Sequence, residues 1–239
     1  MSYQAIFKRY ELKFLLTREQ QQRILDAMEP YMALDKYGRT TIRNIYFDTD
    51  SYRLIRRSIE KPAYKEKLRI RSYRRASPDS EVFVELKKKY QSVVYKRRLS
   101  MPERQALDWL CGGKGCPADS QIAREISYFL SHYGELKPTV LLSYEREAYY
   151  CRSGGDFRVT FDDNILCRRE DISLESAVGG TPLLEEDKVL MEVKTSGAVP
   201  LWMTRVLSRE KIYKTSFSKY GTAYETMILP YTKGGCIYA

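Results

Sequence analysis

Charged and apolar residues alternate along at least seven stretches of this chain, and this alternation restricts its fold more than any other feature. In a β-strand, residues two apart point to the same face of the sheet. Lys67, Arg69 and Arg71 would therefore share one face, with Leu68 and Ile70 on the opposite face. The pattern predicts a sheet with one charged face and one apolar face.

The same alternation, bounded by turn residues, predicts eight strands near residues 5–15, 41–48, 66–75, 81–90, 92–99, 139–150, 156–163 and 188–196. Helical periodicity predicts helices over about 17–34, 100–110, 120–133 and 200–212, the first two opened by capping boxes at Thr17 and Ser100. Strands separated by turns and helices, without repeated βαβ units, are typical of an α+β fold with an antiparallel sheet. No linker or repeat divides the chain, so we predict a single domain over residues 1–239.

Arginine and lysine recur at matching positions on these strands, with few acids among them. A sheet that closes on itself with its charged faces inward would form a basic, water-filled tunnel, and about eight strands suffice for a barrel with a modest interior. We therefore expect an antiparallel β-barrel with the helices packed outside, against the apolar faces. An open sheet with one solvated face is the alternative.

Glutamate and lysine stand two residues apart in three apolar settings, at Glu11 and Lys13, at Glu85 and Lys87, and at Glu192 and Lys194. Each pair would place one acid and one base on the same face of a strand. A carboxylate can hold a divalent metal ion and an ammonium group can hold a phosphate, so the repeated pair suggests a site for a metal-bound polyanion. Cross-strand ion pairs on a solvated face would give the same pattern.

The 239-residue chain has a formal net charge of +10, which favours an anionic partner. It contains neither a GxxxxGK[ST] phosphate loop nor a GxGxxG motif, so side chains rather than a helix N-terminus would hold phosphate. The 20 tyrosines could stack on bases, which makes single-stranded nucleic-acid binding a competing hypothesis. Basic residues that follow the strand period and are mixed with glutamate suit a metal–phosphate site better, so we expect no nucleic-acid partner.

The cysteines and the single histidine argue against other site chemistries. The five cysteines are scattered and no Cys or His pair completes a zinc site, so we expect free thiols in a reducing cytoplasm. His132 is the only histidine, and it has no motif around it that would suggest catalysis. We find no signal peptide and no run of about 20 apolar residues, so we expect no transmembrane segment in the chain.

An ordered set of short motifs over nearly the whole chain resembles the triphosphate tunnel metalloenzymes of the CYTH-like superfamily. Within them, the chain is most similar to the VTC domain, the catalytic domain of polyphosphate polymerases. The motifs are Arg9-Tyr-Glu-Leu-Lys-Phe14, Tyr46-Phe-Asp-Thr49, Leu68-Arg-Ile-Arg71, Val84-Glu-Leu-Lys87, Tyr95-Lys-Arg-Arg98, Tyr144-Glu-Arg146, Arg158-Val-Thr-Phe-Asp162, Met191-Glu-Val-Lys194 and Ser216-Phe-Ser-Lys-Tyr220.

The resemblance implies a tunnel that binds a triphosphate together with Mn²⁺ or Mg²⁺. Two departures from the family are visible: Ser216 stands where a basic residue is usual, and Arg9 stands where many relatives have a first glutamate. By this resemblance and the strand faces, the predicted substrate-binding residues are Lys13, Arg69, Arg71, Lys87, Lys89, Lys96, Arg98, Tyr144, Arg146, Arg158, Ser218 and Lys219. The catalytic set is predicted to be Lys13, Arg69, Arg71, Lys87, Arg146, Arg158 and Glu192, and the metal ligand Glu192 with help from Glu11 and Glu85.

These residues lead to a first hypothesis of metal-dependent phosphoryl transfer from a nucleoside triphosphate to a growing inorganic polyphosphate chain. Hydrolysis of an inorganic or nucleoside triphosphate is the first alternative, because water can replace the acceptor in the same chemistry. A non-catalytic polyphosphate sensor is the second, suggested by Ser216. The expected partners are the nucleotide and the polyphosphate, with a membrane-protein partner that would hold the chain at the cytoplasmic face of a membrane.

Overall fold

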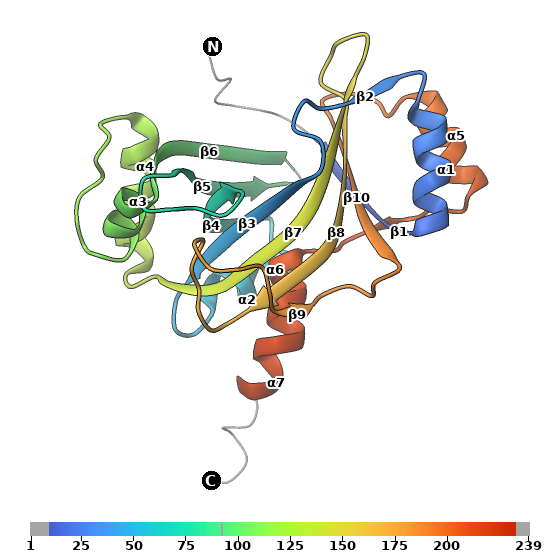
Figure 1. The fold of residues 1–239 in the computed structure, drawn as a ribbon. Helices are drawn as coiled ribbons and strands as arrows, with labels where there is room; N and C mark the ends of the chain where they lie inside the picture. The colour runs from blue at the N-terminus through green and yellow to red at the C-terminus, as the bar shows by residue number, and fades with distance from the viewer. Residues whose placement is uncertain (1–9, 92, 233–239) are drawn as a thin grey trace.

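One antiparallel sheet runs through the structure, a computed structural model that describes residues 10–91 and 93–232. Nine strands follow one another in the order β11-β1-β10-β8-β7-β3-β4-β5-β6, while β2 pairs with β7 and β9 with β8. The strongly twisted sheet lies between two pairs of helices (Figure 1). The strands are β1 (Tyr10–Thr17), β2 (Met32–Leu34), β3 (Thr40–Asp48), β4 (Tyr64–Tyr73), β5 (Glu81–Tyr90), β6 (Val93–Pro102), β7 (Lys137–Cys151), β8 (Arg158–Arg168), β9 (Thr181–Pro182), β10 (Lys188–Thr195) and β11 (Lys214–Thr215).

All eight predicted strands are present, as β1, β3, β4, β5, β6, β7, β8 and β10. Residues 5–9 of the first predicted strand lie outside the described residues. The alternation of side chains is also confirmed on β4, where Leu68 and Ile70 are fully buried in a hydrophobic core. Three short strands were not predicted, because two- and three-residue strands have no period to detect.

The predicted closed barrel is wrong in one respect, because the sheet path ends at β11 and β6 and no backbone pairing joins these ends in the described part of the chain. β1 pairs with β10 on one edge and with the short β11 on the other. The edge of β1 that would have to meet β6 is therefore already taken by β11. The fold is mixed α and β with a large antiparallel sheet that curves without closing.

Two pairs of helices cover the apolar faces of the sheet, as predicted (Figure 1). α1 (Arg18–Met28) and α5 (Leu201–Arg209) pack on β1, β8 and β10 through a core that includes Ile24, Met191 and Val206. α3 (Glu103–Leu110) and α4 (Gln121–Tyr133) pack on β4 and β5, where Trp109 and Phe129 meet the same cluster as Leu68.

The predicted helix boundaries hold at some ends and fail at others. The capping box at Thr17 is confirmed by reciprocal hydrogen bonds with Gln20, but α1 ends at Met28 and residues 32–34 form β2. The predicted box at Ser100 is wrong, since Ser100 lies in β6, where its hydroxyl donates to Glu81, and Pro102 caps α3. The cross-strand ladder of β5 and β6 continues to Pro102 and so delays the start of the helix.

Three C-terminal helical segments and α2 (Arg53–Ile59) were not predicted, and they correct the expectation that all helices lie outside. α6 (Lys219–Ala223) continues through a π-helical turn (Tyr224–Ile228) into α7 (Leu229–Thr232). α2 and α6 pack on the face of the sheet that also presents the charged residues, through Ile55, Tyr220 and Ala223. Part of that face is therefore apolar and covered.

Asp48 holds two of these unpredicted helices, α2 and α6, in place. Its buried carboxylate accepts hydrogen bonds from the backbone amides of Leu54 at 2.8 Å and Ile55 at 3.0 Å in α2, and from the Tyr220 hydroxyl of α6 at 2.9 Å. A carboxylate at a helix N-terminus satisfies amide groups that have no partner within the helix. The Tyr46-Phe-Asp-Thr49 motif thus has a structural role that its sequence did not reveal.

Two sequence expectations about the whole chain can be compared with the described residues. Cys111, Cys116, Cys151 and Cys167 are free thiols, as expected, while Cys236 lies outside the described residues. No helix among residues 10–91 and 93–232 is long and apolar enough to span a bilayer.

Candidate functional site

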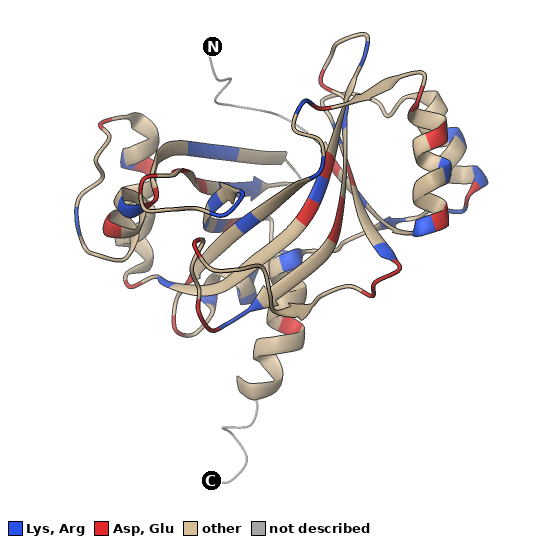
Figure 2. Ribbon diagram, in the orientation of Figure 1, with Lys and Arg blue, Asp and Glu red and all other residues tan. Residues whose placement is uncertain are grey.

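Charged side chains from seven strands and from α6 converge on the concave side of the sheet. Figure 2 shows charged residues along the strands as well as on the helices. Contacts between elements that are not neighbours in the sheet demonstrate the convergence. Lys87 of β5 pairs with Glu11 of β1 at 2.7 Å, and Lys67 of β4 donates to the hydroxyl of Ser218, which precedes α6, at 3.0 Å. We call the following residues the interior cluster: Glu11, Lys13, Lys67, Arg69, Arg71, Glu85, Lys87, Lys96, Arg98, Arg146, Asp162, Glu192, Lys194 and Lys219.

Glu85 is the hub of one half of the interior cluster. Its side chain is only 1% exposed, and its carboxylate pairs with Arg69 at 2.7 Å, with Lys96 at 2.7 Å and with Arg98. Burial alone would raise the pKa of this carboxyl, but Arg71, Arg69 and Lys96 together hold it well below its usual range. Glu85 therefore fixes the predicted phosphate ligands in position. Its predicted role as a metal ligand stays a prediction, and a metal ion there would have to displace these cations.

Asp162 is the hub of the other half. The side chain is completely buried and accepts two hydrogen bonds from Arg146, at 2.5 and 2.6 Å, and one from Lys219 at 2.5 Å. Burial opposes ionisation, but Arg146 and Lys219 lower the pKa of Asp162. The two-bond geometry with a guanidinium group is the strongest common form of ion pair. Asp162 thus orients two predicted substrate-binding residues.

Glu192 lies beside Asp162 but is held differently. Its carboxylate has Lys194 at 3.1 Å, Arg146 at 3.5 Å and both Lys13 and Lys219 at 3.6 Å, and 11% of its side chain is exposed. Burial opposes ionisation, but Lys194, Lys219 and Lys13 hold the pKa of Glu192 well below its usual range. This carboxylate is ionised, slightly exposed and has no contact as short as those that enclose Asp162.

The four carboxylates of the interior cluster are the candidate ligands for a divalent metal ion. Among residues 10–91 and 93–232, no three His, Cys, Asp or Glu side chains are grouped to hold a metal by themselves. Mg²⁺ is usually held by one or two carboxylates together with substrate phosphates. Glu192 fits that arrangement as a hard oxygen ligand, whereas the carboxylate of Glu11 is already occupied by Lys87 at 2.7 Å. The residues present therefore fit a metal that arrives with a phosphate ligand.

Tyrosines position several of the cations. The Tyr46 hydroxyl accepts a hydrogen bond from Arg69 at 2.9 Å, and the Tyr144 hydroxyl accepts one from Arg71 at 3.3 Å. Lys219 lies 4.4 Å from the centre of the Tyr144 ring, and Arg146 lies at 5.2 Å. Burial would raise the pKa of Tyr144, but Arg71, Arg146 and Lys219 outweigh burial and lower it. These rings fill the space between guanidinium groups and limit their movement.

The predicted site residues fall into two groups. Those in the interior cluster, together with Tyr144 and Ser218, lie together on the concave side. Arg158 is exposed at the start of β8, and Lys89 is half-buried near the end of β5; within the described residues neither forms an ion pair. Both share the charged face with the others by strand position, because Arg158 is two residues from Thr160 and Lys89 two residues from Lys87.

Sequence reasoning missed the roles of Asp162, Lys67, Tyr46 and Asn44. Asn44 accepts a hydrogen bond from Arg71 at 3.0 Å. A signal was present for Asp162 and Lys67, which lie at positions of the charged parity on predicted strands. The strand of Asn44 and Tyr46 has no such signal, because its charged residues Arg43 and Asp48 fall on opposite faces. What the sequence lacks is the pairing register that places Asp162 opposite Arg146.

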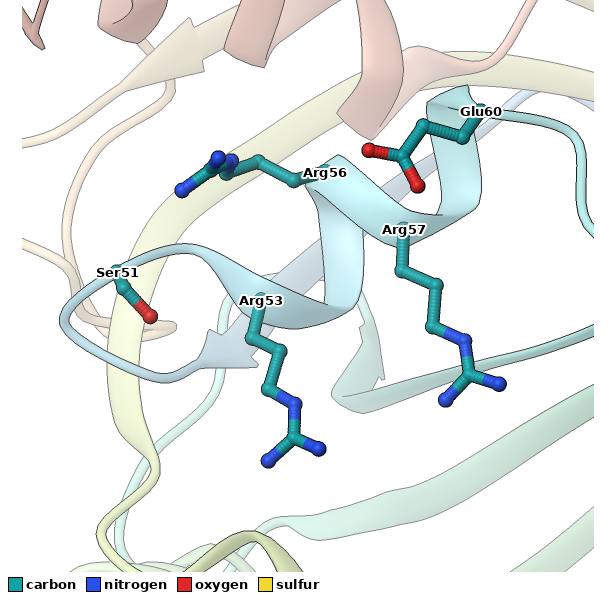
Figure 3. Close-up of a pocket in the computed structure, with 5 residues that line it drawn as sticks. All are labelled: Ser51, Arg53, Arg56, Arg57 and Glu60. Carbon is teal, nitrogen blue, oxygen red and sulfur yellow. The ribbon is translucent and has the colours of Figure 1, made fainter.

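A second basic surface lies on α2, apart from the interior cluster. Its pocket is lined by Ser51, Arg53, Arg56, Arg57 and Glu60, all of them exposed. Arg53 and Arg57 extend to the same side of the helix, while Arg56 extends to the other (Figure 3). No predicted site residue lines this pocket, which is therefore separate from the interior cluster.

Residues 8–228, most of the chain, match the family model described as the VTC domain. A search among curated proteins gave no match.

Two solved structures share the fold. A Hippeastrum protein, described as a candidate adenylyl cyclase with a dominant triphosphatase activity, is 17% identical, with a TM-score of 0.57 over 94% of this chain and 98% of that one. A candidate adenylate cyclase from Bacillus halodurans is 16% identical, with a TM-score of 0.56 over 90% of this chain and 95% of that one. At such identities the similarity establishes the fold alone.

Proposed function

The chain belongs to the VTC-domain family, and on that premise we propose that it transfers the terminal phosphoryl group of a nucleoside triphosphate to an inorganic polyphosphate chain. The observation that supports this most is the charge of the interior cluster, in which ten basic side chains stand against four acidic ones. Such an excess repels itself when the site is empty and favours a polyanion.

In the proposed reaction, an oxygen of the terminal phosphate of the chain attacks the γ-phosphorus, and the bond to the β-phosphate oxygen breaks. The nucleoside diphosphate leaves, and the polyphosphate is one unit longer. The attacking oxygen is already anionic, so no general base is needed. Positioning and charge neutralisation supply most of the catalysis in phosphoryl transfer.

The residues of the interior cluster would divide this work. Arg69, Arg71 and Arg146, fixed by Glu85 and Asp162, offer planar donors to the phosphate oxygens. Lys13, Lys87, Lys96 and Lys219 add point charges, while Ser218 adds a hydroxyl, and Arg158 and Lys89 would meet the parts of the substrate that extend beyond the cluster. Glu192 would hold Mn²⁺ or Mg²⁺, with Glu11 as a helper once Lys87 turns from it to the substrate. The metal would supply positive charge that neutralises the phosphate oxygens.

Hydrolysis of a triphosphate is the second candidate function, favoured by the triphosphatase activity described for the Hippeastrum protein of the same fold. The two reactions use the same cations and metal, and they differ only in whether water or a phosphate oxygen attacks. A sensor that binds polyphosphate without turnover is the third hypothesis. It rests on Ser216, which is exposed and stands where the family usually has a basic residue.

The test is to incubate the purified chain with ATP and Mn²⁺ or Mg²⁺ and to separate the products by gel electrophoresis. Chains of increasing length support the polymerase, and orthophosphate without chains would show hydrolysis and overturn the polymerase. A Glu192→Gln variant serves as the control for contaminating enzymes. The same proposal includes Mn²⁺ or Mg²⁺ as the metal, a single domain over residues 1–239, and action in the cytoplasm beside a membrane-protein partner.

A further inference from the structure

Lys67 has a setting unlike that of any other lysine of the interior cluster. It lies on β4 two residues from Arg69, is half-buried, and donates a hydrogen bond to the Ser218 hydroxyl at 3.0 Å. Its ammonium group also lies 6.0 Å from the centre of the Tyr220 ring. Among the described residues it has no carboxylate within ion-pair distance.

The other lysines of the cluster each have an acidic partner. Lys87 has Glu11 at 2.7 Å and Lys96 has Glu85 at 2.7 Å. Lys219 has Asp162 at 2.5 Å, while Lys194 and Lys13 have Glu192 at 3.1 and 3.6 Å. Within the part of the chain that the structure describes, Lys67 is therefore the lysine of the cluster that has no carboxylate to compensate its charge.

Among residues 10–91 and 93–232, the groups found to face Lys67 are cationic or neutral. Lys13 faces it from β1, Lys87 from β5, and Arg69 and Lys65 from its own strand. Ser218 and Tyr220 face it from the start of α6. Burial and these cations lower the pKa of Lys67 from 10.5 to about 7, so a large share of the molecules have a neutral amine there at neutral pH.

Ser218 complements this amine. Its oxygen caps α6 by accepting from the Gly221 amide at 3.1 Å, and it also accepts from Lys67. A hydroxyl has two lone pairs and one proton, so the proton of Ser218 remains free to donate to a further oxygen. An amine and a hydroxyl within hydrogen-bond distance of each other, among predicted phosphate ligands, form a compact donor pair for one phosphate group.

We propose that Lys67 and Ser218 form a phosphate subsite of the interior cluster and that Lys67 takes up a proton from solvent when a polyphosphate anion binds. The negative phosphate supplies the partner that the free protein lacks, so the ammonium form becomes the stable one. This subsite also places a cation next to the terminal motif, where Ser216 and the preceding Lys214 are both exposed. The ligand class rests on the proposed function, but proton uptake on binding does not require turnover.

The experiment is calorimetric titration of the full chain with tripolyphosphate, without divalent metal, at pH 8 in buffers of different ionisation enthalpy. The dependence of the heat on the buffer gives the number of protons taken up. The wild-type protein should take up close to one proton more than Lys67→Arg, whose guanidinium is always charged. The difference should vanish near pH 6, where Lys67 is already protonated. Ionisation of the ligand itself is the same in both titrations and cancels.

Lys67→Gln provides the second variant, should arginine not fit. It should lose the same proton uptake and bind tripolyphosphate at least tenfold more weakly, while thermal melting verifies that it is folded. Equal proton uptake in the wild type and in a folded variant would overturn the subsite. Normal proton uptake together with an absence of polyphosphate products would leave the subsite standing and overturn the polymerase instead.

Discussion

The Nζ atom of Lys87 lies 2.7 Å from Oε2 of Glu11, although the two residues belong to β5 and β1, near opposite ends of the sheet path. No backbone pairing joins β6 to β11 in the described part of the chain, so side chains rather than a closed hydrogen-bond ladder bring the ends of the sheet together. Burial opposes ionisation of Glu11, but Lys87 outweighs it and lowers the pKa of Glu11 from 4.5 to about 2. This pair links two strands from opposite ends of the sheet path across the concave side.

Neutralising either partner should weaken this connection. Because the pKa of Glu11 is lower in the folded protein than in the unfolded chain, its stabilisation is fully present above about pH 4.5 and is lost as the pH falls toward 2. We expect a coupling free energy of about 1 kcal/mol, kept small because both side chains are partly exposed. Urea unfolding of Glu11→Gln, Lys87→Met and the double variant at pH 6 measures it. A coupling of zero would mean that the pair does not hold the sheet ends.

Much of this architecture could be predicted from the sequence, because side-chain parity depends only on a strand's own residues. The eight main strands and their charged face followed from that parity, and the outer helices followed from their own helical period. Closure could not be predicted in this way, since it depends on which edges pair, and the edge of β1 is taken by two residues of β11. The helices on the charged face were also missed, since α2 and α6 have seven and five residues and too few turns for a helical period.

The site shows the same division between local and non-local information. The predicted phosphate ligands Arg69, Lys87 and Arg146 do converge, because each lies at the charged parity of its strand. The difference between Asp162 and Glu192 was invisible, because both are acids on strands with basic neighbours. Only the strand register and the approach of Lys219 from α6 decide that the Asp162 carboxylate is enclosed and that the Glu192 carboxylate is slightly exposed.

Neutralising Glu192 should therefore affect mainly turnover, and neutralising Asp162 should affect mainly stability. Glu192→Gln should still fold, with some loss of stability because Lys13 and Lys194 lose their carboxylate partner. It should bind tripolyphosphate but lose a hundredfold or more in turnover, because the oxygen ligand for the metal is gone. Asp162→Asn should cost about 3 kcal/mol in the free energy of unfolding, because it removes the closest carboxylate from Arg146 and Lys219 and leaves them only the longer contacts to Glu192. Thermal melts and ATP turnover over a Mn²⁺ titration separate the two effects. A Glu192→Gln enzyme with the wild-type metal dependence would contradict the assignment of the ligand.

Neutralising Glu85 should destabilise the free protein more than it harms the liganded one. Glu85→Gln leaves Arg69, Lys96 and Arg98 without their shared carboxylate, which should cost about 3–5 kcal/mol. A bound polyanion can replace that negative charge, so tripolyphosphate should raise the melting temperature of the variant by more than it raises that of the wild type.

The matched control for this experiment is Glu81→Gln, which removes an exposed glutamate from the same strand. It should change the melting temperature little and leave the effect of tripolyphosphate unchanged. Equal ligand shifts in Glu85→Gln and in the wild type would show that the polyanion does not reach the cations around Glu85.

Lys67 should lower the stability of the free protein, because its charge is unfavourable there. Its pKa is about 7 in the folded protein and 10.5 in the unfolded chain, so the cost is full below pH 7 and fades as the pH rises toward 10.5. Lys67→Met should therefore raise the free energy of unfolding by about 1–2 kcal/mol at pH 6, or the melting temperature by roughly 2–8 °C, and by less at pH 9. Lys114→Met, at an exposed lysine paired with Asp108, is the control and should change stability by no more than about 0.5 kcal/mol.

A binding site can retain a charge that lowers the stability of the folded protein. A Lys67→Met protein that melts lower than the wild type at pH 6 would instead make Lys67 a structural residue held by its bond to Ser218.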